Sequence, residues 1–231
     1  MPDVTAVGGT SLLLDTNNKI TSEVAWGNPA NRGTTGASGG GISTVFNRPA
    51  WQTGPGVPSG TMRVLPDVAA VGDPSTGGLL TYNGKNTQIG GTSLSSPIWA
   101  AWCAMINQSR AAAGKPPLGA LNPRIYKLMG SAAFRDITTG GNSVYQAGPG
   151  YDLTTGVGVP NVSALLSALA DDAFAPTIEI QSGGRFTTTG QGATFYVVAT
   201  AAPRAVYRWQ IQRSGISTWS DLTESDHYRA Q

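Results

Sequence analysis

The sequence predicts a layered α/β domain followed by a shorter all-β segment. In residues 1–172, apolar strands punctuated by glycine alternate with helical stretches, which is the pattern of a sheet covered by helices. In residues 173–231, short alternating strands follow one another without a helix. The chain has 31 glycines and 15 prolines in 231 residues, a content that indicates many tight turns. We therefore expect two domains, divided between residues 172 and 173.

Strand signals are clearest in the middle of the first domain. Residues 68–71, Val-Ala-Ala-Val, form a short apolar run that is typical of a buried parallel strand. Residues 79–82 and 87–89 flank Asn83-Gly84, and both of these turn residues tolerate a positive φ. This arrangement predicts a hairpin whose second arm leads into Gly-Gly-Thr-Ser at residues 90–93.

Three helices are predicted after this hairpin. Residues 98–106 are apolar on every side, so we expect a central, buried helix that ends near Gly114. Asn122 followed by Pro123 predicts a short helix with asparagine as its N-cap. Asn161 is the expected cap of the last helix, because apolar residues follow it at helical spacing.

Composition excludes several classes of function. The net charge is +2 without a basic cluster, so we expect no nucleic-acid partner. No apolar run approaches the ~18–20 residues that cross a bilayer, so we expect no membrane span. The single cysteine, Cys103, excludes an internal disulfide framework, and we interpret it as a small core residue. Only 12% of residues are charged, which favours a secreted protein, and we expect a monomer.

Residues 91–97, Gly-Thr-Ser-Leu-Ser-Ser-Pro, have the features of a nucleophile turn. A glycine lets the backbone bend sharply before a helix, and the helix N-terminus offers free N–H groups to a developing oxyanion. The alternative interpretation is an ordinary glycine turn with a serine or threonine cap. A second Gly-Gly-Thr-Ser, at residues 8–11, is followed by a strand-like run, and we interpret it as structural.

Residues 91–97 resemble the nucleophile segment that subtilisins and sedolisins share, and three further segments are similar to sedolisins. Residues 2–10 contain Pro-x-Val-Thr-x-Val-Gly-Gly-Thr, and residues 38–43 read Ser-Gly-Gly-Gly-Ile-Ser. Residues 63–70 read Arg-Val-Leu-Pro-Asp-Val-Ala-Ala, of which subtilisins share part. The resemblance covers about residues 2–170. It implies a serine-carboxyl peptidase with a subtilisin-like doubly wound parallel sheet, of which this chain holds the C-terminal portion.

The resemblance to sedolisins implies that Ser93 is the catalytic nucleophile and that the substrates are polypeptides. In that family a Glu–Asp pair and a further Asp near the oxyanion assist the serine, and all three precede the segment that begins here. Asp3, Asp15, Glu23 and Asp67 match none of them, and Asp67 is expected to be a buried acid paired with Arg63. The fragment alone is therefore expected to be inactive, because a serine hydroxyl without a base is a poor nucleophile.

The resemblance also implies one structural Ca²⁺ ion. Its ligands would be the carboxylates of Asp136 and Asp152 with the carbonyls of Ile137, Gly148 and Gly150. Such a mixture of carboxylate and backbone oxygens suits Ca²⁺, which takes ~6–8 oxygen ligands. The alternative is two aspartates in a turn-rich loop without a metal.

The second domain resembles the opening strands of an immunoglobulin-like domain. Trp209 would be the buried tryptophan of its third strand. A complete sandwich needs ~100 residues, so this immunoglobulin-like segment is expected to be partial, and it would contact a surface or another domain. Its histidine, His227, is the only one in the chain and is interpreted as a surface residue.

Two alternatives to a sedolisin-type enzyme remain open at this stage. A subtilisin-type serine peptidase would need a histidine before Ser93. A non-catalytic binding or adhesion protein would carry a degenerate peptidase fold and an immunoglobulin-like module, but the intact Ser93 motif and calcium acids argue against degeneration.

Overall fold

The computed structural model describes residues 4–27, 36–170, 174–184, 187–188, 190–202 and 206–222. The chain divides into two compact units, Met1–Ala173 and Phe174–Gln231. Asp3 and His227 lie outside the described residues.

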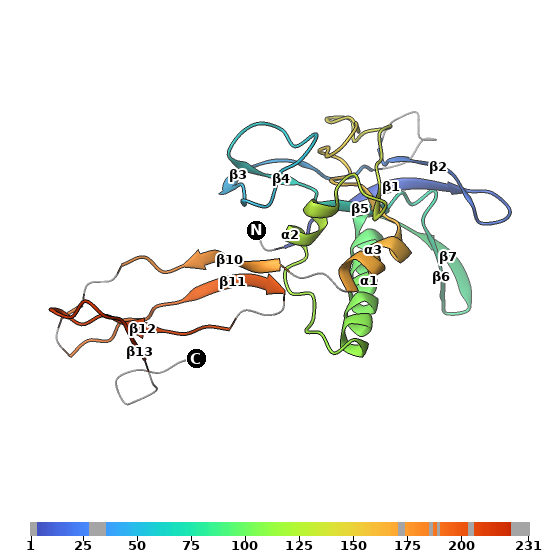
Figure 1. Ribbon diagram of the computed structural model, residues 1–231. Coiled ribbons are helices and arrows are strands. Elements are labelled where there is room, and N and C mark those ends of the chain that lie inside the picture. Colours follow the sequence, from blue (N-terminus) through green and yellow to red (C-terminus); the bar gives the residue numbers. More distant parts are fainter. Residues whose placement is uncertain are drawn as a thin grey trace. The chain divides into compact units, whose positions relative to one another are not determined.

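A three-stranded sheet forms the centre of the first unit (Figure 1). Its order is β2 (Ile20–Ala25), β1 (Val7–Leu14) and β5 (Val68–Val71). β1 pairs with β2 in the antiparallel sense and with β5 in the parallel sense. The prediction of a buried parallel strand at residues 68–71 is therefore confirmed.

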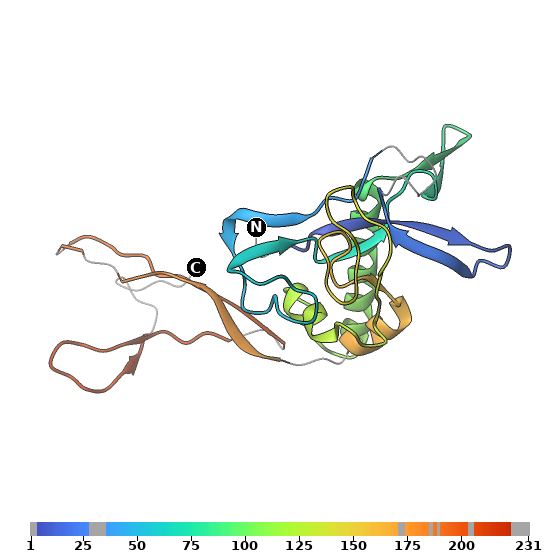
Figure 2. The same cartoon turned by 90° about the horizontal axis from the view of Figure 1, so that it is seen from above.

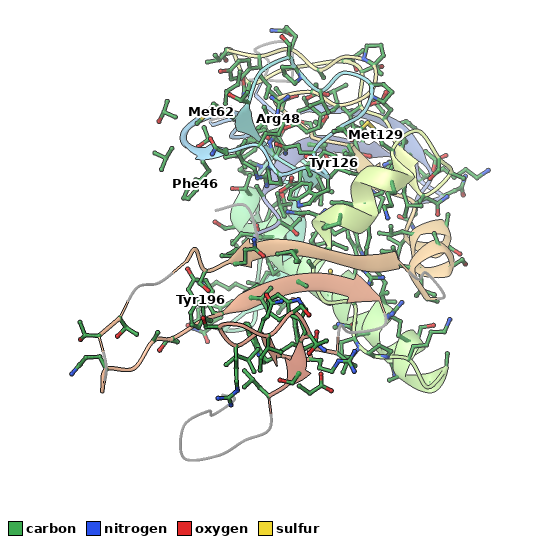
Figure 3. All side chains as sticks on the ribbon, turned by 60° about the vertical axis from the view of Figure 1, so that its left-hand side comes forward. Phe46, Arg48, Met62, Tyr126, Met129 and Tyr196 are labelled. Atoms are coloured by element: carbon green, nitrogen blue, oxygen red, sulfur yellow. The ribbon has the colours of Figure 1, made fainter. Side chains whose placement is uncertain are left out.

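The remaining elements of the first unit are short apart from α1. They are β3 (Gly41–Asn47), β4 (Met62–Leu65), β6 (Gly78–Tyr82), β7 (Lys85–Ile89), α1 (Thr92–Ala112), α2 (Asn122–Ile125), η1 (Tyr126–Leu128), β8 (Phe134–Arg135), β9 (Val159–Pro160) and α3 (Val162–Ala170). β3 pairs with β4 in the antiparallel sense. Directly after β3, the Arg48 side chain donates a hydrogen bond to the Met62 carbonyl of β4 at 3.0 Å (Figure 3).

The helix α1 runs beneath β1 and β5, and both views show it crossing them (Figures 1 and 2). The Trp99 indole N–H donates to the Ala69 carbonyl of β5 at 2.9 Å, and Ile106 is buried on the same face. α3 packs beside α1 and buries Leu165 and Leu169, as its apolar spacing predicts. The hydrophobic core of the unit therefore lies between the sheet, α1 and α3.

The prediction that α1 is buried on every side is wrong in this structure. Ala101, Ala104 and Met105 are exposed on the face opposite Trp99. Cys103 is half-buried beside the core, and burial raises the pKa of its thiol. The helix itself carries apolar residues on all of its faces, as the sequence indicates. The described elements, however, cover only the face that carries Trp99.

The predicted helix at Asn122 exists, although asparagine is not its cap. Leu121 holds the N-cap position, and no side-chain hydrogen bond caps α2. The Asn122 side chain instead donates to the Val4 carbonyl at 3.2 Å and accepts from the Thr5 hydroxyl at 2.7 Å. The amide therefore fastens the start of the chain to α2, a long-range role that local capping rules do not reveal.

The predicted hairpin is confirmed as β6 and β7. These strands pair in register around Asn83 and Gly84, whose φ values are 49° and 71°. Both turn residues are thus in the left-handed region that asparagine and glycine tolerate. The hairpin leads directly into the turn before α1.

The second unit contains two short β-pairs. β10 (Phe174–Gln181) pairs with β11 (Val197–Ala202), and β12 (Gln210–Ile211) pairs with β13 (Ser220–Asp221), both antiparallel. The expectation that Trp209 is buried is wrong here, since 42% of it is exposed. A sandwich tryptophan is covered by a second packed sheet, and the described residues of this unit show no such layer over Trp209.

Candidate active site

Ser93 lies in the first turn of α1, immediately after the β6–β7 hairpin. Gly91 is the N-cap, with φ 87° and ψ 163°, and its carbonyl accepts the Leu94 amide at 2.9 Å. The Ser93 side chain is exposed. Its own amide sits where a helix has no intrahelical acceptor, so this N–H is free to bind an anion.

Hydrogen bonds hold this turn against the carboxyl end of β5. The Gly91 amide donates to the Gly72 carbonyl at 2.5 Å. One turn further along α1, the buried Ser95 hydroxyl lies 3.0 Å from the Val71 carbonyl and 3.2 Å from the Ala70 carbonyl. Ligands of α/β proteins bind beyond the carboxyl ends of parallel strands. Ser93 therefore stands at the edge of the sheet where a substrate is expected.

Gly91 adopts a backbone conformation that only glycine tolerates. We predict that Gly91→Ala lowers the free energy of unfolding by about 1–3 kcal/mol, because a φ of 87° with extended ψ is strained for any other residue. Chemical denaturation measures this loss. Gly39→Ala is the matched control, since an added Cβ there meets no atom within 4 Å. Equal stability of the two variants would contradict the prediction.

Within the part of the chain that the structure describes, no carboxylate or imidazole is hydrogen-bonded to Ser93. Three of the acids considered from the sequence have other partners. Glu23 accepts the Thr10 hydroxyl and pairs with Arg135. Asp67 pairs with Arg63 at 2.5 Å, as predicted, and Asp15 accepts backbone amides of its own turn. A general base for Ser93 is not among them.

Sequence reasoning missed Asp73, which is 1% exposed and lies in the loop after β5. Its carboxylate accepts the Ser11 hydroxyl at 2.5 Å and the Ser75 amide at 2.9 Å. An Asp-Pro pair after a buried strand was the available signal, because aspartate commonly accepts backbone amides in turns.

The two aspartates assigned to calcium both contact the loop of residues 148–150. Asp136 accepts the Gly150 amide at 2.7 Å, and Asp152 accepts the Gly148 amide at 3.4 Å. One carboxylate thus comes from a residue before this loop in the sequence and the other from a residue after it, and both accept amides of the loop. Ile137 is 2% exposed and packs in a small hydrophobic cluster with Ala25, Ala69 and Val159.

Asp152 is held more firmly than Asp136. One of its oxygens accepts the Thr154 amide and hydroxyl and the Thr155 amide, at 2.8, 2.5 and 2.8 Å. In the described ranges no group of three or more His, Cys, Asp or Glu side chains is placed to hold a metal. Two carboxylates with peptide carbonyls from glycines remain a donor set that suits Ca²⁺.

Among the described residues, no helix is both long and apolar enough to span a bilayer.

Comparisons with known proteins agree on one family, although no family model matches the chain. It is 42% identical to kumamolisin of Bacillus sp. (strain MN-32) over 184 residues, covering 74% of this chain and 32% of kumamolisin. It is 35% identical to tripeptidyl-peptidase 1 of Homo sapiens over 195 residues, covering 73% of this chain and 32% of that protein. It is 33% identical to sedolisin of Pseudomonas sp. (strain 101) over 182 residues, covering 75% of this chain and 30% of sedolisin.

A solved structure gives the same answer for the fold. Pseudomonas sedolisin, a serine-carboxyl proteinase complexed with two molecules of pseudo-iodotyrostatin, matches with a TM-score of 0.62 and 32% identity. The match covers 72% of this chain and 46% of that chain.

A serine at the start of a helix that crosses the end of a parallel strand, in a fold shared with a solved proteinase, places the first unit among the serine peptidases of subtilisin-like fold. Within that class the chain belongs to the sedolisin family of serine-carboxyl peptidases. This assignment favours sedolisins over the subtilisin alternative. The chain spans about a third of the length of the curated relatives that it matches.

Proposed function

We propose that this chain is the nucleophile-bearing part of a secreted, acid-acting endopeptidase that cleaves polypeptides through an acyl-enzyme on Ser93. The observation that carries the proposal is the exposure of Ser93 in a turn that Gly72 and Ser95 fix to the end of β5. Membership of the sedolisin family supports this role. A content of only 12% charged residues in the whole chain supports secretion.

The proposed reaction uses the turn in two ways. The Ser93 oxygen attacks the carbonyl carbon of a peptide bond, and its proton passes to a general base. The Ser93 amide donates to the oxyanion that forms, and the amine leaves with a proton as the acyl-enzyme appears. In this proposal the base and the second oxyanion donor are carboxyl groups in the part of the family's peptidase domain that this chain does not match. An oxyanion donor of that kind must be protonated, which favours acid pH.

The test compares two proteins. One is this chain alone, and the other is the same chain preceded by the remaining part of its peptidase domain. We expect the longer protein to hydrolyse acid-denatured haemoglobin and the shorter one to show no hydrolysis. Absence of activity in a folded longer protein at every pH would contradict the proposal, and hydrolysis by the short chain would contradict the placement of the base outside it.

We also propose that Asp136 and Asp152, with the carbonyls of Ile137, Gly148 and Gly150, bind one structural Ca²⁺ ion. The supporting observation is that both carboxylates meet the loop of residues 148–150. When bound, the ion would pin this loop without taking part in the reaction.

Calcium should raise the melting temperature of the chain. At a concentration 100-fold above Kd, a ligand of the folded state adds about 2.7 kcal/mol of stability. We therefore expect excess EGTA to lower the melting temperature and Ca²⁺ to restore it. Asp136→Asn keeps an acceptor for the Gly150 amide but removes a charge, so it should abolish the response. An unchanged melting curve in EGTA would count against the site.

A further inference from the structure

The two Gly-Gly-Thr-Ser segments of this chain are connected in space. The first, residues 8–11, lies in β1, and the second, residues 90–93, ends at the proposed nucleophile. They are joined by the loop of residues 72–77, which follows β5. This loop bonds to β1 on one side and to the nucleophile turn on the other.

On the β1 side, the loop is held by a buried carboxylate. Asp73 is 1% exposed and Ser11 is 6% exposed. The Ser11 hydroxyl donates to Asp73 at 2.5 Å, and the Ser75 amide donates to the other carboxylate oxygen at 2.9 Å. A buried carboxylate needs such donors, because its desolvation is otherwise costly. Removing the Ser11 hydroxyl therefore leaves Asp73 with one side-chain oxygen unsatisfied.

Backbone bonds extend this anchor to the nucleophile turn. The Thr10 carbonyl accepts both the Gly72 amide at 2.9 Å and the Asp73 amide at 3.1 Å. The Gly72 carbonyl, on the same peptide group as the Asp73 amide, accepts the Gly91 amide at 2.5 Å. A shift of Asp73 thus moves the acceptor that fixes the N-cap of α1, two residues before Ser93.

Close packing leaves the loop little room to shift by itself. A Cβ on Gly90 would lie 2.4 Å from the Pro74 Cα, and one on Gly77 would lie 1.9 Å from the Ile89 carbonyl oxygen. The backbone of the loop therefore touches the backbone that enters the turn. Movement in one segment must be accompanied by movement in the other.

We propose that Asp73 and Ser11 are positioning residues that fix the Gly91 turn and thereby the orientation of Ser93. The Asp73 carboxylate holds the Gly72–Asp73 peptide group, and this peptide group holds the Gly91 amide. For its catalytic consequence the proposal rests on the proposed function of Ser93. Its structural part does not.

The structural part is tested in the 231-residue chain by hydrogen exchange. In Ser11→Ala we expect the Gly91 amide to exchange about 10- to 100-fold faster, while the Trp99 indole N–H keeps its rate. Ser11→Thr restores a hydroxyl and should restore slow exchange. Thr81→Ala is the matched control, because it removes a hydroxyl bond of 2.7 Å to Asn86 within the β6–β7 hairpin. Unchanged exchange at Gly91 in Ser11→Ala would overturn the proposal.

The catalytic part is tested in the longer protein that contains the rest of the domain. We expect Ser11→Ala and Asp73→Asn to lower kcat about 10- to 100-fold with KM within about two-fold, because a small misplacement of a nucleophile mainly affects the transition state. Unchanged kcat with fast Gly91 exchange would overturn the positioning role. If the parent protein has no Ser93-dependent activity, the proposed function fails, and the exchange result still decides whether Ser11 and Asp73 fix the turn.

Discussion

Replacement of Ser93 by alanine is expected to lower kcat of the complete peptidase by about 10⁴-fold or more, because no acyl-enzyme forms without the hydroxyl. KM should change little, since the Ser93 hydroxyl acts in the transition state and adds little to the binding of the substrate. The melting temperature should also stay the same, because the Ser93 side chain is exposed and the turn is held by Gly91 and Ser95. Initial rates with a peptide substrate at acid pH and a thermal melt measure both quantities.

Ser96→Ala provides the matched control for this substitution. Ser96 is another exposed serine in the first turns of α1, so the same atoms are removed from the same helix. We expect this variant to retain its activity. A Ser93→Ala protein that still hydrolysed its substrate at more than a tenth of the original rate would contradict the assignment of the nucleophile.

Local features of the fold were predictable from the sequence. Asn83-Gly84 sets a two-residue turn whatever surrounds it, and the structure has the hairpin there. The strand at residues 68–71 follows from an apolar run, and α3 follows from its spacing of leucines. These signals lie within a few residues of the element that they specify, so little else in the chain can override them.

Features that depend on distant partners were predicted less well. Asn122 has the identity of an N-cap, yet its amide bonds to residues 4 and 5, more than a hundred positions away. The apolar surround of α1 indicated burial, but the described elements cover only the Trp99 face. Both predictions were wrong, because the packing of a residue against distant parts of the chain cannot be read from its neighbours in the sequence.

The candidate site shows the same division. The position of Ser93 at the start of a helix was predictable because glycine, serine and the helix that follows are adjacent in sequence, and its catalytic role stays a prediction. The link from Ser11 through Asp73 to Gly91 spans eighty residues and exists only because β1 and β5 pair in parallel. Sequence reasoning interpreted the segment at residues 8–11 as structural and predicted a strand directly after it, which lies within β1, but it gave Ser11 no partner.

The first unit is also predicted to depend on a buried ion pair between Arg63 and Asp67. Both side chains are at most 1% exposed and lie 2.5 Å apart. Asp67 further accepts the Ala6 amide at 2.8 Å and the Tyr126 hydroxyl at 2.9 Å. Burial raises the pKa of Asp67 above its ordinary value of 3.8, and its bonds to Arg63, Ala6 and Tyr126 only partly offset this effect.

Arg63→Met is expected to lower the free energy of unfolding by about 3–5 kcal/mol near neutral pH, because it leaves a buried carboxylate without its cation. Loss of the cation raises the folded-state pKa of Asp67 further. The stability that protonated Asp67 contributes is present below its unfolded-state pKa of 3.8. It is lost as the pH rises through the folded-state pKa of Asp67. The deficit should therefore be smaller at pH 4 than at pH 7. Denaturant titrations at both pH values measure it.

The double variant Arg63→Met, Asp67→Asn separates the charge effect from lost packing. It removes the unpaired carboxylate, so its stability should no longer fall with pH relative to the parent protein. Any deficit that remains belongs to the lost packing of Arg63, whose guanidinium carbon lies 5.2 Å from the centroid of the Trp51 ring, and to unsatisfied partners such as Tyr126. An Arg63→Met deficit of equal size at pH 4 and pH 7 would show that packing, and not the buried charge of Asp67, is what this pair contributes.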